Sequence, residues 1–339
     1  MFNLHLIDVS ALLHYGMTSV KYRDKRSYGF PVGGIHKVMY HISVAFAAND
    51  DVILVFDGRN NFRKGIMPEY KAGRIPNKEV IAQADFLYNH LLECNIECLK
   101  MDGFEGDDII NWVSQKAAEL QSVFIIGNDK DLVHNVHGNI TFHSIDRNVN
   151  CVSEANFPFA IEKGVYIPFN FVNVRKVLTG CPSDKVPPFV AEDGTTGAEL
   201  FDSYIDCLSN NKIPFTYSNT ASKTLFLYVM NNANLTEKDK QELQKRVKVI
   251  FPADVPEGFS FNKTNRRNID KDRLSDFLTV VGDNESRKSM QLQYRGASTL
   301  LTDEIKSLSK KLISGEYAVD NNIPVNNVYE DSVIFLKEF

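Results

Sequence analysis

The sequence predicts an α/β fold in which a central, mostly parallel sheet is flanked by helices, followed by a mostly helical C-terminal region. Three observations support this prediction. Short apolar runs, such as residues 52–56, alternate with longer segments whose apolar residues recur every three or four positions. Several of these short runs end at an aspartate. Beyond about residue 152 the strand pattern does not return at length, so the remainder is expected to be mostly helical.

The first elements follow from apolar spacing. Residues 4–7 form an apolar run that predicts a strand ending at Asp8, and a charged loop that includes residues 21–26 follows it. Residues 33–48 predict a helix because their apolar side chains fall on one side at helical spacing. The apolar run 52–56 predicts the second strand, which also ends at an aspartate.

The same alternation continues along the first half of the chain. In residues 109–120 the apolar side chains Ile109, Val113 and Ala117 share one helical face. Strand, helix and strand in repeated order indicate a parallel sheet covered by helices. We therefore expect further helices at 80–94, 109–120 and 132–136, further strands at 96–99, 123–126 and 140–143, and a first domain that spans residues 1–165.

Residues 166–339 are expected to form the second, mostly helical region. Thr236 precedes the clearest of its helices as an N-cap. The segment 287–339 shows only a weak pattern. Helices are expected at 169–179, 198–208, 224–232 and 237–249.

Composition is ordinary for a globular protein, because 43% of the 339 residues are hydrophobic and 24% are charged. The net charge of −5 argues against indiscriminate binding of nucleic acid and leaves local basic patches as the relevant feature. Five cysteines, an odd number without a C-x-x-C pair, indicate reduced thiols. A zinc site that combines Cys94 and Cys98 with His134 and His137 has the wrong spacing for the common zinc modules. With no basic leader and no long apolar segment, we expect a cytoplasmic protein without a membrane span.

Acidic residues repeatedly follow the expected strands. Asp8, Asp57 and Asp129 each come after an apolar run, and residues 102–108 add a second acidic stretch. One such aspartate is usually a turn former or a helix cap, but the repetition favours a function. The carboxyl ends of parallel strands meet at one edge, where the carboxylates would repel one another unless cations neutralised them. Oxygen-only ligands suit a hard cation such as Mg²⁺, so the pattern predicts a metal site that cuts phosphodiesters.

A basic segment follows the second strand. Residues 59–78 carry six basic residues and one acidic residue, Glu69, with Phe62 and Tyr70 interleaved. Such a run is commonly a solvated surface loop, but its place beside the expected metal edge favours contact with phosphates and unstacked bases. A second basic stretch at 263–273 fits a duplex contact and plain surface equally well. The predicted nucleic-acid-binding residues are Arg59, Arg63, Lys64, Tyr70, Lys78, Lys263, Arg266 and Arg267.

These motifs resemble the 5′-nuclease family: flap endonucleases, the 5′-nuclease domains of bacterial DNA polymerases and, most of all, the phage 5′–3′ exonucleases. The resemblance runs from about residue 6 to 184. It rests on five motifs in order, which are residues 7–10 (Ile-Asp-Val-Ser), 55–58 (Val-Phe-Asp-Gly), 68–74 (Pro-Glu-Tyr-Lys-Ala-Gly-Arg), 105–108 (Glu-Gly-Asp-Asp) and 129–132 (Asp-Lys-Asp-Leu).

The resemblance implies a PIN-like nuclease domain with a basic arch inserted at about residues 59–80 and a DNA-binding C-terminal region. It further implies two Mg²⁺ ions, for which Mn²⁺ can substitute, about 4 Å apart in an in-line displacement that leaves a 5′-phosphate. Lys71 and Arg74 would neutralise charge on the scissile phosphate. The first ion would be held by Asp8, Asp57, Glu105 and Asp107, and the second by Asp108, Asp129, Asp131 and Asp184.

Two departures from the family pattern stand out. Cys181 replaces an aspartate of the family's last acidic motif, and a thiol is a poor ligand for Mg²⁺. Residues 189–197 do not keep the family's glycine-x-glycine hairpin, which grips duplex DNA, and the basic stretch at 263–273 is a possible substitute.

The expected substrates are DNA with 5′ flaps, nicks or free 5′ ends, and RNA–DNA hybrids. We expect the protein to act as a monomer together with replication proteins. Its expected location is the cytoplasm, or the host cytoplasm for a viral protein. The resemblance covers both exonucleolytic and endonucleolytic cutting. The alternative is a catalytically impaired module of the same fold that binds DNA junctions, for which Cys181 is the support. An RNA-cutting toxin domain would be far shorter, and an aspartyl-phosphatase would need an acid where Ser10 stands.

Overall fold

A five-stranded, fully parallel sheet forms the centre of the protein, as predicted. The computed structural model describes residues 2–145, 152–153, 159–162, 165–168, 171–211, 224–225, 228–232, 234–256, 258–262, 264 and 267–317. The sheet has the order β5-β4-β1-β6-β7. Its strands are β1 (Leu4–Asp8), β4 (Asp51–Val55), β5 (Cys98–Leu99), β6 (Val123–Gly127) and β7 (Ile140–Ser144).

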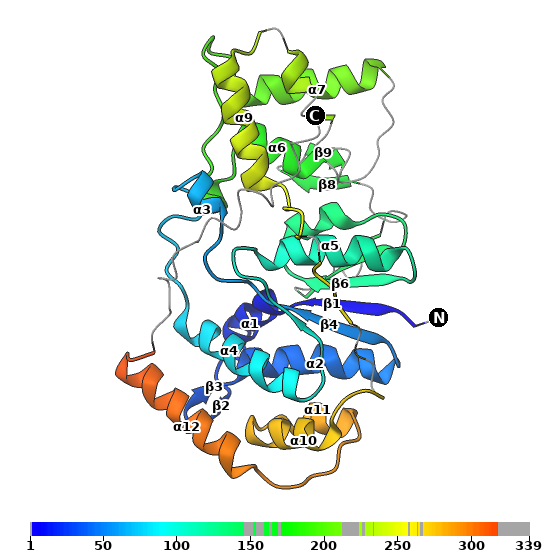
Figure 1. Cartoon of the computed structure of the whole chain (residues 1–339), viewed down its shortest axis with the longest axis vertical. Coiled ribbons are helices and arrows are strands. Elements are labelled where there is room, and N and C mark those ends of the chain that lie inside the picture. The colour runs from blue at the N-terminus through cyan, green and yellow to red at the C-terminus, as the bar shows by residue number, and fades with distance from the viewer. Residues whose placement is uncertain are drawn as a thin grey trace.

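Helices cover both faces of this sheet (Figure 1). Side chains of β1 alternate between two hydrophobic clusters, with Ile7 in one and Leu4 and Leu6 in the other, as the two-residue period of a strand requires. The first cluster contains residues of α1 (Val9–Thr18), α2 (Gly33–Ala47) and α4 (Lys78–Glu93). The second contains residues of α5 (Gly106–Ala118) and the 3₁₀ helix η1 (Lys130–Asn135).

Three local predictions need correction. Helix α1 begins directly after Asp8, in a region for which we predicted only a charged loop. It forms because the Asp8 side chain accepts the N–H of Ala11 at 3.0 Å and so caps the helix. A small hairpin of β2 (Arg26–Ser27) and β3 (Phe30–Pro31) follows it. The helix predicted at 132–136 is the 3₁₀ helix η1, and the strand predicted at 96–99 pairs only over β5.

Helices α1 and α2 pack in direct backbone contact because glycines line their crossing. A Cβ on Gly16 would lie 2.5 Å from the Cα of Gly34, and one on Gly33 would lie 2.1 Å from the carbonyl oxygen of Tyr22. Any larger residue would push the two helices apart. This contact fixes α1, and therefore its N-terminal Asp8, against the rest of the first cluster.

The C-terminal half packs in two places (Figure 1). The hairpin β8 (Phe159–Glu162) and β9 (Val165–Pro168) precedes α6 (Val172–Thr179), α7 (Gly197–Asn211) and α9 (Glu237–Ile250), and these three helices share a third hydrophobic cluster. Thr236 caps α9 as predicted, whereas the helix predicted at 224–232 lies partly outside the described residues. Helices α10 (Lys271–Val280), α11 (Asn284–Ser289) and α12 (Thr299–Ser314) pack beside α2 and α4 instead. Among the described helices, none is long and apolar enough to cross a membrane.

A buried ion pair joins the basic segment to the sheet domain. Arg63 begins the short helix α3 (Arg63–Ile66), and its guanidinium donates two hydrogen bonds to Asp108, at 2.8 and 2.6 Å. The two side chains are 3% and 0% exposed. Arg63 also donates to the carbonyl oxygens of Val249 and Phe251, at the end of α9. One guanidinium therefore connects α3, α5 and α9.

We predict that Asp108→Asn lowers the free energy of unfolding by about 3–5 kcal/mol, because it removes the carboxylate charge that the buried Arg63 binds directly and leaves it only Glu105, at 3.7 Å. Urea denaturation without divalent metal measures this loss. Arg59→Met is the matched control, since Arg59 pairs with Asp85 at 3.3 Å in a partly exposed site worth about 0–1 kcal/mol. Equal stability of the two variants would contradict the structural role of Asp108.

Candidate active site

Four aspartates gather at the carboxyl edge of the sheet. Asp8 ends β1, Asp57 and Asp129 follow β4 and β6, and Asp107 lies in the first turn of α5. Burial, and then the charge of Asp57, raise the pKa of Asp8 to about 7. Burial, together with the charges of Asp129 and Asp8, also raises the pKa of Asp107 well above its ordinary value. These carboxylates therefore lie close enough to repel one another.

Two glycines let these chain segments meet. A Cβ on Gly58 would lie 1.7 Å from the carbonyl oxygen of Met101, so only glycine fits beside that backbone. The N–H of Gly58 donates to the carbonyl of Phe104 at 3.0 Å. The N–H of Gly106 donates to Asp57 Oδ1 at 2.7 Å, where a Cβ would approach the same oxygen to 3.2 Å. The end of β4 and the start of α5 are thus held together directly beside the aspartates.

Glu105 is turned toward the basic segment. Tyr70 donates its hydroxyl to Glu105 Oε2 at 2.9 Å, and the ammonium of Lys71 binds Oε1. Burial alone would raise the pKa of Glu105, but the charges of Lys71 and Arg63 lower it below its ordinary value. Glu105 is therefore a charge-compensated carboxylate, unlike Asp8 and Asp107.

Asp108 does not fit the role of metal ligand predicted from the motif. Its Oδ1 accepts from Arg63 and from the backbone N–H of Ala253 at 2.7 Å, and its Oδ2 accepts from Arg63 and from the N–H of Glu105 at 3.0 Å. A carboxylate offers about four acceptor positions, and all four are occupied. Asp108 is a structural carboxylate that orients the start of α5.

The acids predicted for the second ion lie beside cations. Lys176 of α6 binds Asp131 through its ammonium, and Arg74 donates to Asp184 Oδ1 at 2.9 Å. The Asp129 side chain accepts the backbone N–H of Asp131 at 2.9 Å. Loss of hydration, and then the charge of Asp131, raise the pKa of Asp129. Of these three, Asp129 is the acid without an ion pair among the described residues.

Cys181 packs against protein rather than facing the site. Its thiol is buried beside Met67, Tyr70 and Val186, and donates to Asp184 Oδ2 at 3.1 Å. Burial raises the pKa of the Cys181 thiol, which keeps it protonated and a poor ligand for a hard cation. Its side chain therefore orients Asp184.

The basic segment and the loop that carries Asp184 are tied by their backbones. The N–H of Lys71 donates to the carbonyl of Asp184 at 2.8 Å, and Arg74 donates to the carbonyl of Ser183 at 3.0 Å. Lys71 has a φ of 52°, in the left-handed region that non-glycine residues adopt infrequently. This conformation is held by the bond to Asp184, and it places the ammonium of Lys71 beside Glu105.

The donor set suits a hard divalent cation, although the ligands are not arranged around one. Among the described residues, no three histidine, cysteine, aspartate or glutamate side chains form a group that could hold a metal ion as they stand. Asp8 and Asp57 accept backbone N–H groups, and Glu105 accepts from Tyr70 and Lys71. The carboxylates that repel one another at this edge nevertheless offer only oxygen ligands and excess negative charge.

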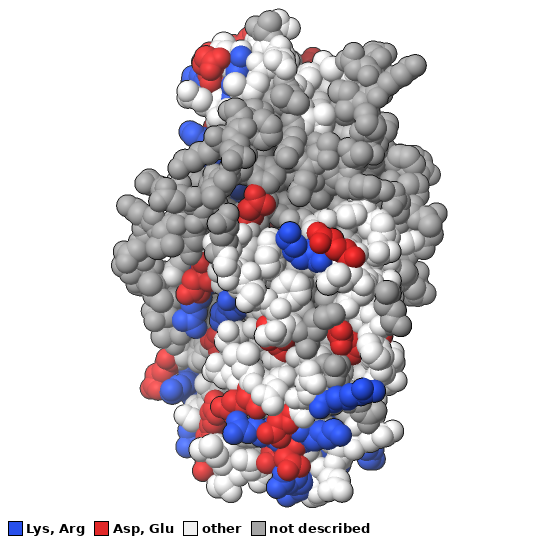
Figure 2. Space-filling model, turned by 45° about the vertical axis from the view of Figure 1, so that its right-hand side comes forward, with Lys and Arg blue, Asp and Glu red and all other residues white. Residues whose placement is uncertain are grey.

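The predicted nucleic-acid-binding residues divide into exposed and buried groups. Arg63 and Tyr70 are buried and hydrogen-bonded to Asp108 and Glu105, so neither is free to bind phosphate or stack on a base, contrary to our prediction. The other members of the basic segment, Arg59, Lys64 and Lys78, are half-buried or exposed, and Arg267 is exposed, whereas Lys263 and Arg266 lie outside the described residues. On the face shown in Figure 2, acidic and basic side chains are intermixed and form no extended patch of one sign among the described residues.

A short hairpin does form at residues 189–197, where the family pattern is absent. Val190 and Thr196 form an antiparallel bridge, and Gly194 takes a φ of 91° in the turn. Its tip carries Glu192 and Asp193, and Glu192 pairs with Lys238 at 2.8 Å. Acidic side chains at this tip disfavour close contact with a phosphate backbone.

The structure adds two residues that our sequence reasoning missed. Lys176 reaches Asp131 from α6, a helix about 45 residues away in the chain. His14 on α1 lies close enough to Asp57 and Arg74 that their charges act on its pKa, which burial lowers. His14 comes six positions after Asp8, which is not a spacing that puts two side chains on one helical face, so no local signal places His14 near the site. No local signal identifies Lys176.

Comparisons with known proteins find similar sequences among DNA polymerases I and 5′–3′ exonucleases. DNA polymerase I of Rhizobium leguminosarum is 27% identical over 217 residues, which cover 60% of this chain and 21% of that protein. The 5′–3′ exonuclease of Bacillus subtilis is 25% identical over 190 residues, 54% of this chain and 64% of that protein. A structure of T5 5′-exonuclease with zinc ions bound shares 15% identity, with a TM-score of 0.45 over 73% of this chain and 99% of that one.

The chain spans only about a fifth to a third of the length of the first two DNA polymerases I that it matches. Residues 3–160, which contain the sheet, the basic segment and most of the gathered acids, match the family model described as the 5′–3′ exonuclease, N-terminal resolvase-like domain. This part of the chain, slightly under half of its length, is therefore similar to the nuclease domain of 5′–3′ exonucleases.

Proposed function

We propose that the protein is a divalent-metal-dependent nuclease that hydrolyses phosphodiester bonds in DNA with 5′ flaps, nicks or free 5′ ends. The observation that carries this proposal is the group of uncompensated aspartates at one edge of the sheet, directly beside Lys71 and Arg74. Excess negative charge needs cations, and the neighbouring bases supply donors for a phosphate. The match of residues 3–160 to the 5′–3′ exonuclease family model supports the same reaction.

The residues fall into defined roles. Asp8, Asp57, Glu105 and Asp107 are the proposed ligands of a first ion, and Asp129, Asp131 and Asp184 those of a second. Asp108 is removed from the predicted set because its acceptor positions are filled. Two Mg²⁺ ions, or Mn²⁺ in their place, would activate a water and stabilise the leaving oxygen.

Lys71 and Arg74 are proposed to bind the scissile phosphate. Burial lowers the pKa of Lys71, but the charge of Glu105 raises it, and the net effect is an increase. The ammonium of Lys71 therefore stays charged. Arg74 is about half exposed and can reach a ligand outside the protein. The left-handed backbone at Lys71 and its bond to Asp184 hold both donors beside the acids. The name of one relative, DNA polymerase I, supports a role in DNA replication. We further propose that the protein acts as a monomer, works with replication proteins and also removes RNA from RNA–DNA hybrids.

A second candidate function is a DNA-junction-binding module of the same fold with impaired catalysis. Two observations favour it. Cys181 stands where the family pattern has an acid and packs against protein. The described carboxylates also do not converge on a formed metal site. Such a module would bind flap DNA without metal-dependent turnover.

We predict that Asp107→Asn lowers the rate of cleavage of a 5′-flap duplex in Mg²⁺ by more than about 100-fold, because it removes a ligand and a charge from the centre of the acid group. Denaturing gels of labelled product measure the rate. Asp303→Asn, at an exposed position on α12, is the control and should cleave normally. Tight flap binding by the unmutated protein without Mg²⁺-dependent cleavage would instead establish the impaired module.

We also predict opposite effects of Asp107→Asn on thermal stability with and without metal. In EDTA the variant should have a Tm higher by about 2 °C or more, because it relieves repulsion from Asp129 and Asp8. Mg²⁺ should raise the Tm of the unmutated protein by binding the folded state, and raise that of the variant less. A lower Tm of the variant in EDTA would show that Asp107 is not electrostatically strained.

A further inference from the structure

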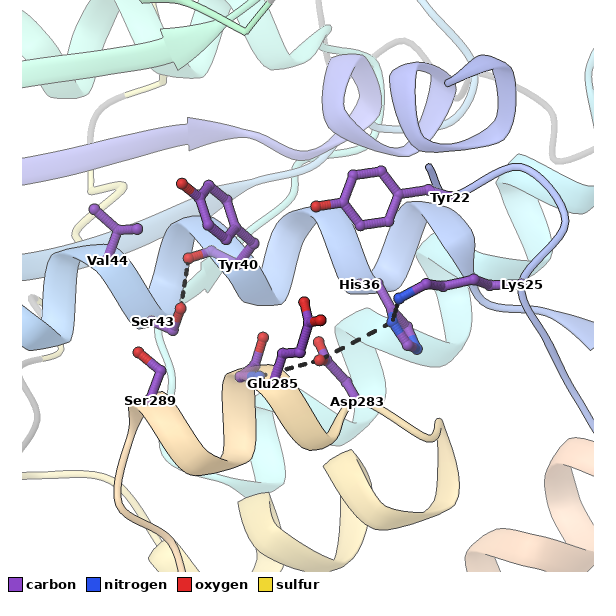
Figure 3. A pocket seen from close by; sticks show the side chains of 10 residues that line it. Tyr22, Lys25, His36, Tyr40, Ser43, Val44, Asp283, Glu285 and Ser289 are labelled. Carbon is purple, nitrogen blue, oxygen red and sulfur yellow. Dashed lines mark hydrogen bonds and ion pairs between the residues drawn. The ribbon is translucent and has the colours of Figure 1, made fainter. Parts of the chain in front are cut away.

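A pocket of about 180 Å³ lies between α2 and α11, and none of the proposed metal ligands lines it (Figure 3). The loop before α2 contributes Tyr22 and Lys25, α2 contributes Tyr40 and Ser43, and Asp283 lies just before α11. The pocket exists because the C-terminal helices pack beside α2. Its chemistry is therefore independent of the acid group at the sheet edge.

Asp283 leaves one carboxylate oxygen without a donor. Its side chain is buried, and Oδ1 accepts the N–H of Ser286 at 3.1 Å and so caps α11. Oδ2 is buried and has no hydrogen-bond partner among the described residues. Native proteins rarely leave a buried acceptor unsatisfied, because the desolvated oxygen loses the hydrogen bonds that water gave it. A ligand with an N–H donor would satisfy this oxygen.

A positive group faces the same pocket. Lys25 donates to His36 Nδ1 at 2.8 Å, and His36 Nε2 donates to the carbonyl of Val281 at 2.8 Å. Burial lowers the pKa of His36, which keeps the imidazole neutral and able to accept from Lys25. An ammonium has three donors, so Lys25 retains two for a ligand. The exposed Glu285 also lines the pocket, and its carboxylate lies 3.9 Å from the ammonium of Lys21, which is not part of the lining.

Aromatic and hydroxyl groups complete the lining. Tyr40 is 46% exposed, and Figure 3 shows its ring and that of Tyr22 on one side of the pocket, across from Asp283 and Ser289. Ser43 donates to the carbonyl of Tyr40 at 2.7 Å, which leaves its oxygen as an acceptor. A flat ring system matches the tyrosine faces. The pocket thus offers an acceptor, a cation and aromatic faces together.

We propose that this pocket binds a nucleoside 5′-monophosphate whose base carries an exocyclic amino group. The amino group donates to Asp283 Oδ2, the phosphate binds Lys25, and the base lies against Tyr40. The proposal rests on the proposed function only for the source of the ligand, since a nuclease that leaves 5′-phosphates releases such molecules. Binding itself requires neither the metal nor turnover.

The test is isothermal titration of the full chain with adenosine 5′-monophosphate in EDTA. The unmutated protein should bind, and Asp283→Asn should bind about tenfold or more weakly, because asparagine keeps the helix cap but loses the charged acceptor. Purine riboside 5′-monophosphate, which lacks the amino group, should show a similar loss on the unmutated protein. Adenosine, which lacks the phosphate, should bind the unmutated protein more weakly than the nucleotide does. The factor should match that by which Lys25→Met weakens binding of the nucleotide.

Asp107→Asn is the control and should bind the nucleotide normally, since Asp107 belongs to the acid group and not to the pocket. No binding to the unmutated protein, equal binding to Asp283→Asn, or loss of binding with Asp107→Asn would each overturn the proposal. If Asp283→Asn fails to fold, the proposal is tested on the unmutated protein with purine riboside 5′-monophosphate, which lacks the amino group, and adenosine, which lacks the phosphate. A failure of flap cleavage leaves these results unchanged, so the two proposals fail separately.

Discussion

Repulsion between carboxylates at the carboxyl edge of the sheet is the constraint on which the rest of the site depends. The carboxylates at this edge fall into two groups according to how their charge is balanced. Glu105, Asp108, Asp131 and Asp184 each pair with a lysine or arginine. The pKa values of Asp8 and Asp107, in contrast, are raised by burial and by the charges of neighbouring aspartates, which are Asp57 for Asp8 and Asp129 for Asp107. The negative charge left over after internal pairing is therefore concentrated on the aspartates at the strand ends, where a divalent cation would be most strongly bound.

The basic segment serves two purposes that its composition does not separate. Arg63 is a buried structural residue that holds α3 against α5 and the end of α9. Lys71 and Arg74 instead sit on a turn whose backbone is tied to Asp184. Because the structural cation anchors the segment, the other two are held beside the acids with little freedom. Cys181 contributes in the same way, since its thiol orients Asp184 rather than binding a metal.

The C-terminal half supports the first domain from two sides. The cluster of α6, α7 and α9 delivers Lys176 and the Asp184 loop to the acids, while α10, α11 and α12 complete the hydrophobic cluster beneath α2 and α4. The second contact is tightly packed yet leaves a pocket that Asp283 and Lys25 both line. Buried apolar side chains, which include Leu274, Phe277 and Ile305, pack tightly and keep the walls of that pocket in place.

The sequence by itself determined the parallel sheet, the gathering of Asp8, Asp57 and Asp129 at one edge, and the resemblance of the first half to 5′–3′ exonucleases. It could do so because strand period, strand ends and motif order are local patterns, and parallel topology then brings the strand ends together. Only the tertiary structure decided what each acid and base faces. Asp107 and Asp108 are neighbours in one motif, yet one is crowded by other acids while the other is saturated by Arg63 and Ala253. The physical reason is that the partners of Asp108 come from α3 and from beyond α9, and contacts between such distant segments form only when the helices pack.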